Sequence, residues 1–262
     1  MKKVLTIAGS DCSGGAGIQA DLKTIQAHGM YGMSVITSIT AQNTTGVYGV
    51  YDVTPEYVEK QIKAIFEDNV PDAVKIGMVS NVGIIKEIVS SLKKYEAKNI
   101  VVDPVMVSTS GCMLLETEAK NVLVHELLPM ADIMTPNIPE AEVLSGIKIN
   151  TEEDMLNAAK QIYKQNGGTV LIKGGHLEDS ANDLLYTEGK AEWFEAKRID
   201  NHNTHGTGCT LSSAIACNLA CNRTVKESVL MAKKYVYCAI NAGLDLGKGD
   251  GPLWHDVEAI SK

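Results

Sequence analysis

The pattern of hydrophobic and polar positions changes its period along the chain. Short apolar runs are typical of buried strands, and apolar residues that recur every three or four positions are typical of amphipathic helices. The runs predict strands near residues 4–8, 34–39, 73–76, 99–102, 131–134 and 169–172. The stripes predict helices near residues 18–25, 58–65, 85–92, 116–127, 138–145, 151–164, 208–221 and 225–239. Two further runs, 183–186 and 192–195, flank a Glu-Gly-Lys turn at 188–190 and predict a hairpin.

This alternation predicts an α/β fold with a mostly parallel central sheet, flanked by helices on both faces. No repeat and no Pro/Ser-rich linker divides the chain, so residues 1–262 are expected to form a single domain. In such sheets ligands bind beyond the carboxyl ends of the strands. Polar or glycine-rich residues follow the predicted strands at 9–11, 42–43, 77–78, 103, 135–137 and 173–175. We therefore expect one shared cleft, the alternative being ordinary polar turns.

Composition and charge narrow the classes of partner. The chain is 45% hydrophobic and 21% charged, which is ordinary for a soluble globular protein. Its net charge of -8 argues against non-specific nucleic-acid binding, which needs a basic surface. Six cysteines without a C-x-x-C pair indicate neither a zinc site nor a disulfide framework. The apolar start is short for a signal peptide and no stretch approaches a membrane span, so we expect a cytoplasmic protein without membrane or nucleic-acid partners.

The first glycine cluster, Gly14-Gly15-Ala16-Gly17, follows the first predicted strand. It lacks the G-x-G-x-x-G spacing of dinucleotide-binding loops and the lysine of a Walker A loop. A turn this rich in glycine still lets the backbone approach a ligand closely. Asp21, in the following helix, lies beside the apolar stripe, where a carboxylate needs a partner. That partner is either a structural group or a substrate hydroxyl, and the sequence leaves both open.

The second glycine cluster, residues 203–209 (NTHGTGC), opens a predicted helix. Gly206, Thr207 and Gly208 would leave backbone N–H groups free, and such a helix start is an anion site. In phosphoryl transfer it would stabilise the charge that spreads over the oxygens of the transferred group. Cys209 lies in the first turn, where we expect the pKa of a thiol to fall, so that it can act as a base. The alternative is a glycine-rich loop before an ordinary core helix.

Three polar residues follow later strands. Lys173 precedes two glycines and can hold a nucleotide phosphate as a point charge, or it is a solvated lysine at a strand end. Asn137 and Glu140 form an N-x-x-E pair at a predicted helix start. The pair can order magnesium and its waters, or it is a helix cap.

These residues together resemble the hydroxymethylpyrimidine/phosphomethylpyrimidine kinases of thiamine biosynthesis, in the ribokinase-like superfamily. The resemblance covers nearly the whole chain, and matched blocks in the right order make it specific. The blocks are 5–11 (LTIAGSD), 13–21 (SGGAGIQAD), 41–44 (AQNT), 75–78 (KIGM), 103–106 (DPVM), 135–137 (TPN), 173–176 (KGGH) and 204–209 (THGTGC).

The resemblance implies a ribokinase-like fold, ATP and Mg²⁺ as cofactors, and a homodimer. It implies phosphorylation of 4-amino-5-hydroxymethyl-2-methylpyrimidine and then of its monophosphate. The pyrimidine pocket would be lined by Gly9, Asp21, Gln42, Met78 and Val105. The anion hole would come from Gly206, Thr207 and Gly208, with Cys209 at the position of the base, which is aspartate in many sugar-kinase relatives. The nucleotide side would contain Lys173, Asn137, Thr204 and His205, and the magnesium side Asp103 and Glu140.

Gln42 favours one substrate over its main alternative. An amide can donate to a ring nitrogen and accept from an exocyclic amine at once, as glutamine does with adenine. An aminopyrimidine offers that edge and pyridoxal does not, and a buried amide left unpaired would cost about 1–3 kcal/mol. A pyridoxal kinase is the alternative within the same superfamily. A non-enzymatic metabolite-binding module, which would bind without forming ADP, is the alternative from another class.

Overall fold

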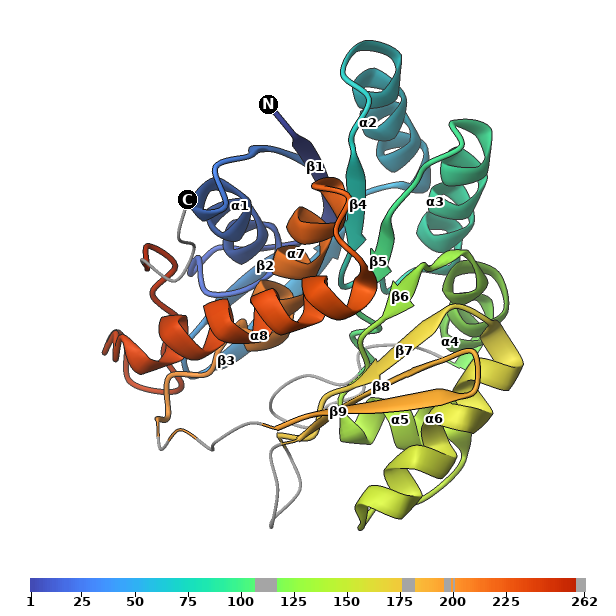
Figure 1. The fold of residues 1–262 in the computed structure, drawn as a ribbon. Coiled ribbons are helices and arrows are strands. Elements are labelled where there is room, and N and C mark those ends of the chain that lie inside the picture. Colours follow the sequence, from blue (N-terminus) through green and yellow to red (C-terminus); the bar gives the residue numbers. More distant parts are fainter. Residues whose placement is uncertain (107–116, 176–181, 196–198, 200, 258–262) are drawn as a thin grey trace.

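The computed structural model describes residues 1–106, 117–175, 182–195, 199 and 201–257. Its centre is a single sheet with the strand order β3-β2-β1-β4-β5-β6-β7-β8-β9 (Figure 1). The strands β1 (Lys3–Asp11), β2 (Tyr31–Asn43), β4 (Ala73–Ile76), β5 (Ile100–Val102), β6 (Ile133–Met134) and β7 (Thr169–Ile172) run parallel. Antiparallel strands close both edges: β3 (Gly46–Asp52) beside β2, and the hairpin β8 (Asp183–Thr187) and β9 (Lys190–Phe194) beside β7. The mostly parallel α/β sheet expected from the sequence is confirmed.

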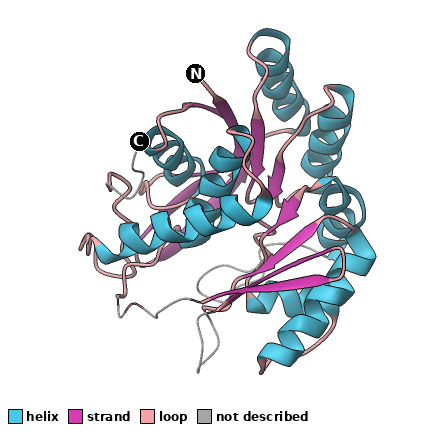
Figure 2. Ribbon diagram, viewed as in Figure 1, coloured by secondary structure: helices cyan, strands magenta, loops and turns pink. Residues whose placement is uncertain are grey.

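The sheet is buried on both faces because its central strands are apolar at consecutive positions. Val4 belongs to one hydrophobic core and Leu5 to the other, and Ile133 and Met134 divide in the same way. Successive side chains of a strand point to opposite faces, so such runs require cover on both sides. Helices supply that cover (Figure 2).

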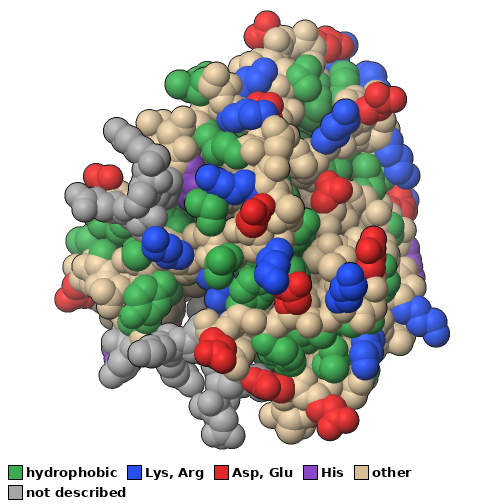
Figure 3. Space-filling view, in the orientation of Figure 1, with side chains coloured by type: hydrophobic (Ala, Val, Ile, Leu, Met, Phe, Trp, Pro, Cys, Tyr) green, Lys and Arg blue, Asp and Glu red, His purple; other side chains and the backbone are tan. Residues whose placement is uncertain are grey.

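One face carries α1 (Gly17–Ala27), α7 (Thr207–Ala220) and α8 (Val225–Asn241). The other carries α2 (Pro55–Asp68), α3 (Val82–Lys94), α4 (Thr117–Val122), α5 (Ile138–Ser145) and α6 (Glu152–Asn166). None of the described helices is long and apolar enough to cross a bilayer. The face shown in Figure 3 carries acidic and basic side chains intermixed.

Local sequence predicted most elements, including α5 and the β8–β9 hairpin. The helix expected at 116–127 is α4 followed by a π-helical turn, Leu123–Leu127, and residue 116 lies outside the described residues. Strand β3 was not predicted. It is an edge strand whose interior residues, 47–51, are all exposed. Because neither face of the strand is buried, its sequence (VYGVY) does not alternate between apolar and polar positions, and that alternation is the signal of a half-buried strand.

Candidate active site

The two glycine clusters meet at the carboxyl edge of the sheet. Gly206 is the N-cap of α7 and has a φ of 86°, which favours glycine. A Cβ at Gly206 would overlap the carbonyl oxygen of Gly15 in the loop after β1. This close approach joins the start of α7 to the first glycine loop, so that both border one site.

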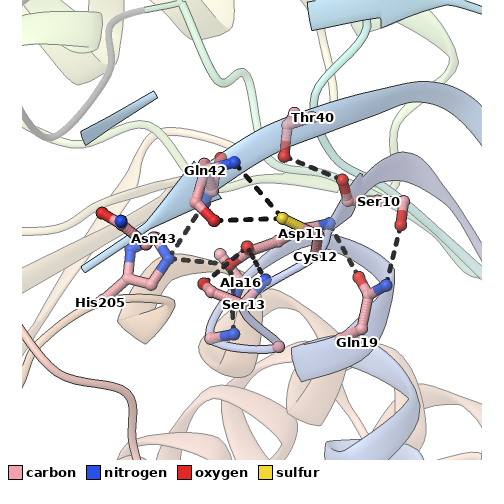
Figure 4. Close-up of polar contacts among 12 residues, drawn as sticks. Ser10, Asp11, Cys12, Ser13, Ala16, Gln19, Thr40, Gln42, Asn43 and His205 are labelled. Carbon is pink, nitrogen blue, oxygen red and sulfur yellow. Dashed lines mark hydrogen bonds and ion pairs between the residues drawn. The ribbon is translucent and has the colours of Figure 1, made fainter. Parts of the chain in front are cut away.

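His205, one residue before the N-cap, reaches the ends of β1 and β2 (Figure 4). Its Nε2 lies 2.9 Å from Oδ2 of Asp11 and 3.2 Å from the amide nitrogen of Gln42. Gln42 is partly exposed at the end of β2. The start of α7 and the glutamine therefore share one cluster of contacts.

Asp11 organises the loop between β1 and α1. Its Oδ1 accepts from the backbone N of Ser13 at 2.8 Å, and its Oδ2 accepts from the backbone N of Ala16 at 2.8 Å. Burial alone would raise the pKa of Asp11, but hydrogen bonds from His205, Ser13 and Ala16 hold it well below its ordinary value. Asp11 is therefore a fixed anion that only accepts hydrogen bonds.

The first turn of α7 offers backbone donors to the cleft. The N–H groups of Gly206, Gly208 and Cys209 have no hydrogen-bond acceptor among the described residues, whereas Thr207 donates to the carbonyl of Thr204 at 3.1 Å. A Cβ at Gly208 would lie 3.3 Å from both Asp103 Oδ2 and Lys173 Nζ. The helix start therefore lies against this charged pair, and its free N–H groups are donors of the kind that bind anions at helix N-termini.

Lys173 and Asp103 form an ion pair at the ends of β7 and β5. Lys173 Nζ lies 2.8 Å from Asp103 Oδ1, which also accepts from Thr135 Oγ1 at 3.0 Å. Burial opposes the charge on Lys173, but Asp103 and Glu140 raise its pKa above the ordinary value. The lysine is therefore a cation held in place by a carboxylate, and its side chain is 17% exposed.

Glu140 and Asn137 form a capping box at the start of α5. The Asn137 N–H donates to Glu140 Oε2 at 2.8 Å, and the Glu140 N–H donates to Asn137 Oδ1 at 2.9 Å. Burial and the nearby Asp103 raise the pKa of Glu140 to about 7, against the opposing pull of Lys173. Among the described residues, no three His, Cys, Asp or Glu side chains are grouped to hold a metal.

The prediction that the helix start lowers the pKa of Cys209 is wrong. Burial raises the pKa of its thiol to about 11, although the positive charge of Lys75 opposes the shift. In the first turn of a helix the terminus favours the thiolate, but here loss of solvation has the larger effect.

Asp21 is fully buried beneath the same helix. Its carboxylate accepts from Lys75 Nζ at 2.8 and 2.9 Å, from Thr6 Oγ1 at 2.6 Å and from Ser213 Oγ at 2.8 Å. Neither Asp21 nor Lys75 has exposed side-chain surface. The structure therefore gives Asp21 the structural partner that the sequence left open, and it offers no surface to a substrate in this conformation.

With this geometry, comparison with known proteins identifies the family. Residues 11–254 match the family model described as phosphomethylpyrimidine kinase. The chain belongs to the phosphomethylpyrimidine kinase family. A relative from Rhizobium meliloti, named hydroxymethylpyrimidine/phosphomethylpyrimidine kinase, is 49% identical over 96% of this chain and 96% of its own length. The chain spans about half the length of the bifunctional thiamine biosynthesis proteins that it also matches, one of them from Geobacter sulfurreducens.

Solved structures agree with the family and with the fold. The crystal structure of phosphomethylpyrimidine kinase from Clostridium difficile 630 has a TM-score of 0.82 and 51% identity, covering 90% of this chain and 98% of that one. Pyridoxal kinase from Staphylococcus aureus in complex with ADP has a TM-score of 0.91 and 37% identity, covering 98% and 94%. The ribokinase-like fold expected from the sequence is therefore confirmed.

Within this family fold, two residues expected on the nucleotide side have other contacts. His205 lies beside Gln42 and Asp11, because the left-handed Gly206 turns the chain between it and α7. Thr204 is exposed and its carbonyl accepts from Thr207 N and Oγ1, which closes the turn before the helix. His176, at the end of the KGGH block, lies outside the described residues.

The remaining expected pocket residues lie at the ends of β1, β4 and β5. Met78 approaches Gly9 so closely that a Cβ at Gly9 would be 2.7 Å from Met78 Cε. Met78 also borders a cavity of about 490 Å³ with residues of β3 and the start of α3. Val105 is partly exposed two residues after Asp103. Sequence reasoning placed Asp11 at the expected cleft without a role and missed Lys75 as a member of the site, although both lie in blocks that carry the family resemblance.

Proposed function

We propose that the chain transfers the γ-phosphoryl group of ATP to the hydroxymethyl group of 4-amino-5-hydroxymethyl-2-methylpyrimidine, and then phosphorylates the monophosphate. One observation carries the proposal: the free N–H groups of α7, the cation of Lys173 and the amide of Gln42 are linked by neighbouring contacts, since Gly208 lies against Lys173 and His205 contacts Gln42. The first two suit a phosphoryl group, and the third suits an aminopyrimidine edge. The relative from Rhizobium meliloti carries both activities in its name.

At the ring end, Gln42 would bind the nitrogen-bearing edge of the pyrimidine. Met78 and Val105 would contact its apolar faces, and Gly9 would admit it close to the backbone, because any side chain there would displace Met78. Asp21 would contribute only from beneath, by supporting α7 through Ser213, because Asp21, Ser213 and Lys75 are all fully buried. These contacts orient the hydroxymethyl group toward the start of α7.

Where the phosphoryl group is transferred, the residues would mainly orient the reacting groups and stabilise negative charge. They would contribute less by removing the proton of the hydroxyl group. The N–H groups of Gly206, Gly208 and Cys209 would bind the equatorial oxygens, with Thr207 fixing the turn between them. Lys173 would neutralise phosphate charge. The Cys209 thiol carries its own proton at neutral pH in the free protein, so it would accept the hydroxyl proton only as the thiolate, after releasing that proton to solvent.

Asp103 and Glu140 fit a magnesium ion that is held mainly by nucleotide phosphates and water. Both carboxylates are buried, and the negative charge of each is unfavourable to the other, which a cation would relieve. Mg²⁺ commonly takes one or two carboxylates and substrate phosphates, and it would screen phosphate charge there. Asn137 would hold Glu140 in place through the capping box, and Thr204 would support the turn facing the nucleotide.

Product analysis tests the proposal. The protein, ATP and magnesium are incubated with the hydroxymethylpyrimidine, and mass spectrometry separates mono- from diphosphate. We expect both products in sequence, and competition at equal concentration should favour the pyrimidine over pyridoxal. Preferential formation of pyridoxal phosphate would support the activity named for the Staphylococcus aureus neighbour instead. Binding of the pyrimidine without ADP formation would indicate a non-enzymatic module.

The proposal extends to a cytoplasmic homodimer. Strand β3 is an unpaired edge that exposes Tyr48 and Tyr51, at 68% and 72%, next to Ile39 of β2. Exposed apolar edges of this kind favour association with a second copy. The five described cysteines are free thiols, as expected in a reducing compartment. Sedimentation equilibrium should give twice the monomer mass of 28.1 kDa.

A further inference from the structure

His205 has two neighbours that make conflicting demands on one nitrogen. Its Nε2 lies 2.9 Å from Asp11 Oδ2 and 3.2 Å from the amide end of Gln42 (Figure 4). Asp11 is a carboxylate anion that cannot donate, because its pKa is held well below the ordinary value. His205 Nε2 must therefore carry a hydrogen and act as the donor.

A donor on His205 decides which way the Gln42 amide is turned. With the amide nitrogen toward His205, two N–H donors would face each other across 3.2 Å. Rotation of the amide by half a turn places Oε1 there instead, with almost no change of shape, and the contact becomes favourable. The Gln42 –NH₂ then points away from His205.

The surroundings leave this cluster little freedom. Asp11 is held by the backbone N–H groups of Ser13, Gly15 and Ala16. The backbone of His205 donates to the carbonyl of Gly251 at 3.1 Å, and a Cβ on Gly15 would overlap the imidazole. Gln42 is anchored through its backbone, which exchanges contacts with the Cys12 thiol at 3.1 and 3.3 Å. Only the end of the Gln42 side chain is left to adjust.

We propose that His205 is a positioning residue which, held by Asp11, fixes the Gln42 amide with its –NH₂ toward the ligand. The site therefore selects a ring that presents a nitrogen acceptor at that edge. Oε1 keeps a second lone pair, so an exocyclic amine next to the ring nitrogen can also be bound. The inference rests on the proposed function, and it makes His205 part of the specificity for an aminopyrimidine over pyridoxal.

The test is a double-mutant cycle on ligand binding, measured by calorimetry with the hydroxymethylpyrimidine in the absence of nucleotide. We expect His205→Leu and Gln42→Ala each to weaken binding about tenfold, which is about 1.4 kcal/mol. Because His205 acts through Gln42, the double variant should be no weaker than Gln42→Ala alone. Gln42→Glu, which keeps an acceptor for His205 but loses the –NH₂, should weaken binding at least as much.

Conservative and remote variants separate positioning from loss of structure. His205→Gln places an amide nitrogen near the position of Nε2 and should bind within about threefold of the wild type, whereas His205→Leu should not. His125→Leu, at an exposed histidine on the opposite face, should bind as the wild type. The KM for ATP should change less than about twofold in His205→Leu.

The outcomes are distinct. Additive losses in the double variant, or unchanged binding by His205→Leu, would overturn the positioning role while leaving the proposed kinase intact. Absence of pyrimidine binding by the wild-type protein would overturn the proposed function, and with it the role of His205. Equal losses in His205→Gln and His205→Leu would show that the imidazole contributes shape and not a hydrogen-bond donor.

Discussion

Two lysine–aspartate ion pairs have the same N–O distance and lie near the Cys209 thiol, where their charges affect its pKa. They differ in their surroundings. Lys75–Asp21 and Lys173–Asp103 both have an N–O distance of 2.8 Å. The first has no exposed side-chain surface, and Asp21 receives further hydrogen bonds from Thr6 and Ser213. The second is partly exposed on the lysine side, at 17%.

The difference shows how one chemical pair serves two purposes. Burial would lower the pKa of Lys75, but Asp21, with a smaller contribution from Asp103, raises it above the ordinary value. Lys173 also interacts with two carboxylates, Asp103 and Glu140, but its side chain is partly exposed, which suits exchange of ligands. The sealed pair, Lys75–Asp21, therefore supports the start of α7 from below, and the open pair, Lys173–Asp103, can act on a phosphate. A third pair, Lys2–Asp72 at the amino ends of the strands, is 2.8 Å long and more exposed than the other two, at 39% and 28%, which makes it a control.

The largest expected effect is on stability, from breaking the sealed pair. Lys75→Met should lower the free energy of unfolding by about 3–5 kcal/mol, because it leaves the charge of Asp21 buried without a counter-charge. Chemical denaturation measures the loss. Lys2→Met should cost about 1 kcal/mol or less, because an exposed pair contributes little.

A second variant sharpens this result. Lys75→Met combined with Asp21→Asn removes the unpaired charge and should recover part of the lost stability. If Lys75→Met alone were as stable as the wild type, the Lys75–Asp21 pair would contribute nothing to the stability of the fold. The structural role assigned to the sealed pair would then be wrong.

The next effect is on turnover, from breaking the open pair. Lys173→Met should lower kcat by about 10²–10³-fold, the usual cost of removing one donor that stabilises transition-state charge. Its loss of stability should be smaller than that of Lys75→Met, because water reaches the cleft. Steady-state kinetics with ATP and the pyrimidine provide the measurement.

The control for turnover is again the surface pair. Lys2→Met should keep the wild-type kcat. A normal kcat in Lys173→Met would show that Lys173 does not stabilise the transferred phosphate. Its function would then be limited to the ion pair with Asp103.

Sequence reasoning reached the layout of the site but not its electrostatics. The position of Lys173 and Asp103 at one edge followed from the predicted parallel strands, because their carboxyl ends meet, whereas the α7 start was placed beside them only by the family resemblance. The pKa of Cys209 did not follow. A helix start is a local feature of sequence, whereas burial of the thiol depends on long-range packing that no local pattern reports.

The contacts of His205 and Asp21 also lay beyond the sequence. His205 lies 163 positions from Gln42 and 194 from Asp11, and its direction depends on the left-handed Gly206. Asp21 was correctly expected beside an apolar stripe, but its partners come from β1, β4 and α7. Periodicity places a side chain on a face of its own helix, and only the tertiary fold decides what meets it there.

The smallest expected effect is a pH dependence of stability that arises from Glu140, next to the open pair. Burial, reinforced by Asp103, raises the pKa of Glu140 from 4.5 to about 7 despite Lys173. Between these values the folded protein retains a proton that the unfolded chain releases, so this group's contribution to stability falls as pH rises from 4.5 to 7. The fall is at most about 3 kcal/mol.

Glu140→Gln isolates that contribution from the other titrating groups. The free energy of unfolding of the wild type minus that of Glu140→Gln, from denaturation at pH 4.5, 5.5 and 7, should decrease with pH. Glu142→Gln on the same helix is the matched control. Bonds from Ile149 and Lys148 lower the pKa of Glu142 despite its partial burial, so its contribution is lost only at lower pH and its difference should stay flat. A flat difference for Glu140 as well would mean that it is already ionised at pH 4.5. Lys173 would then balance its charge fully, and the open pair would resemble the sealed one.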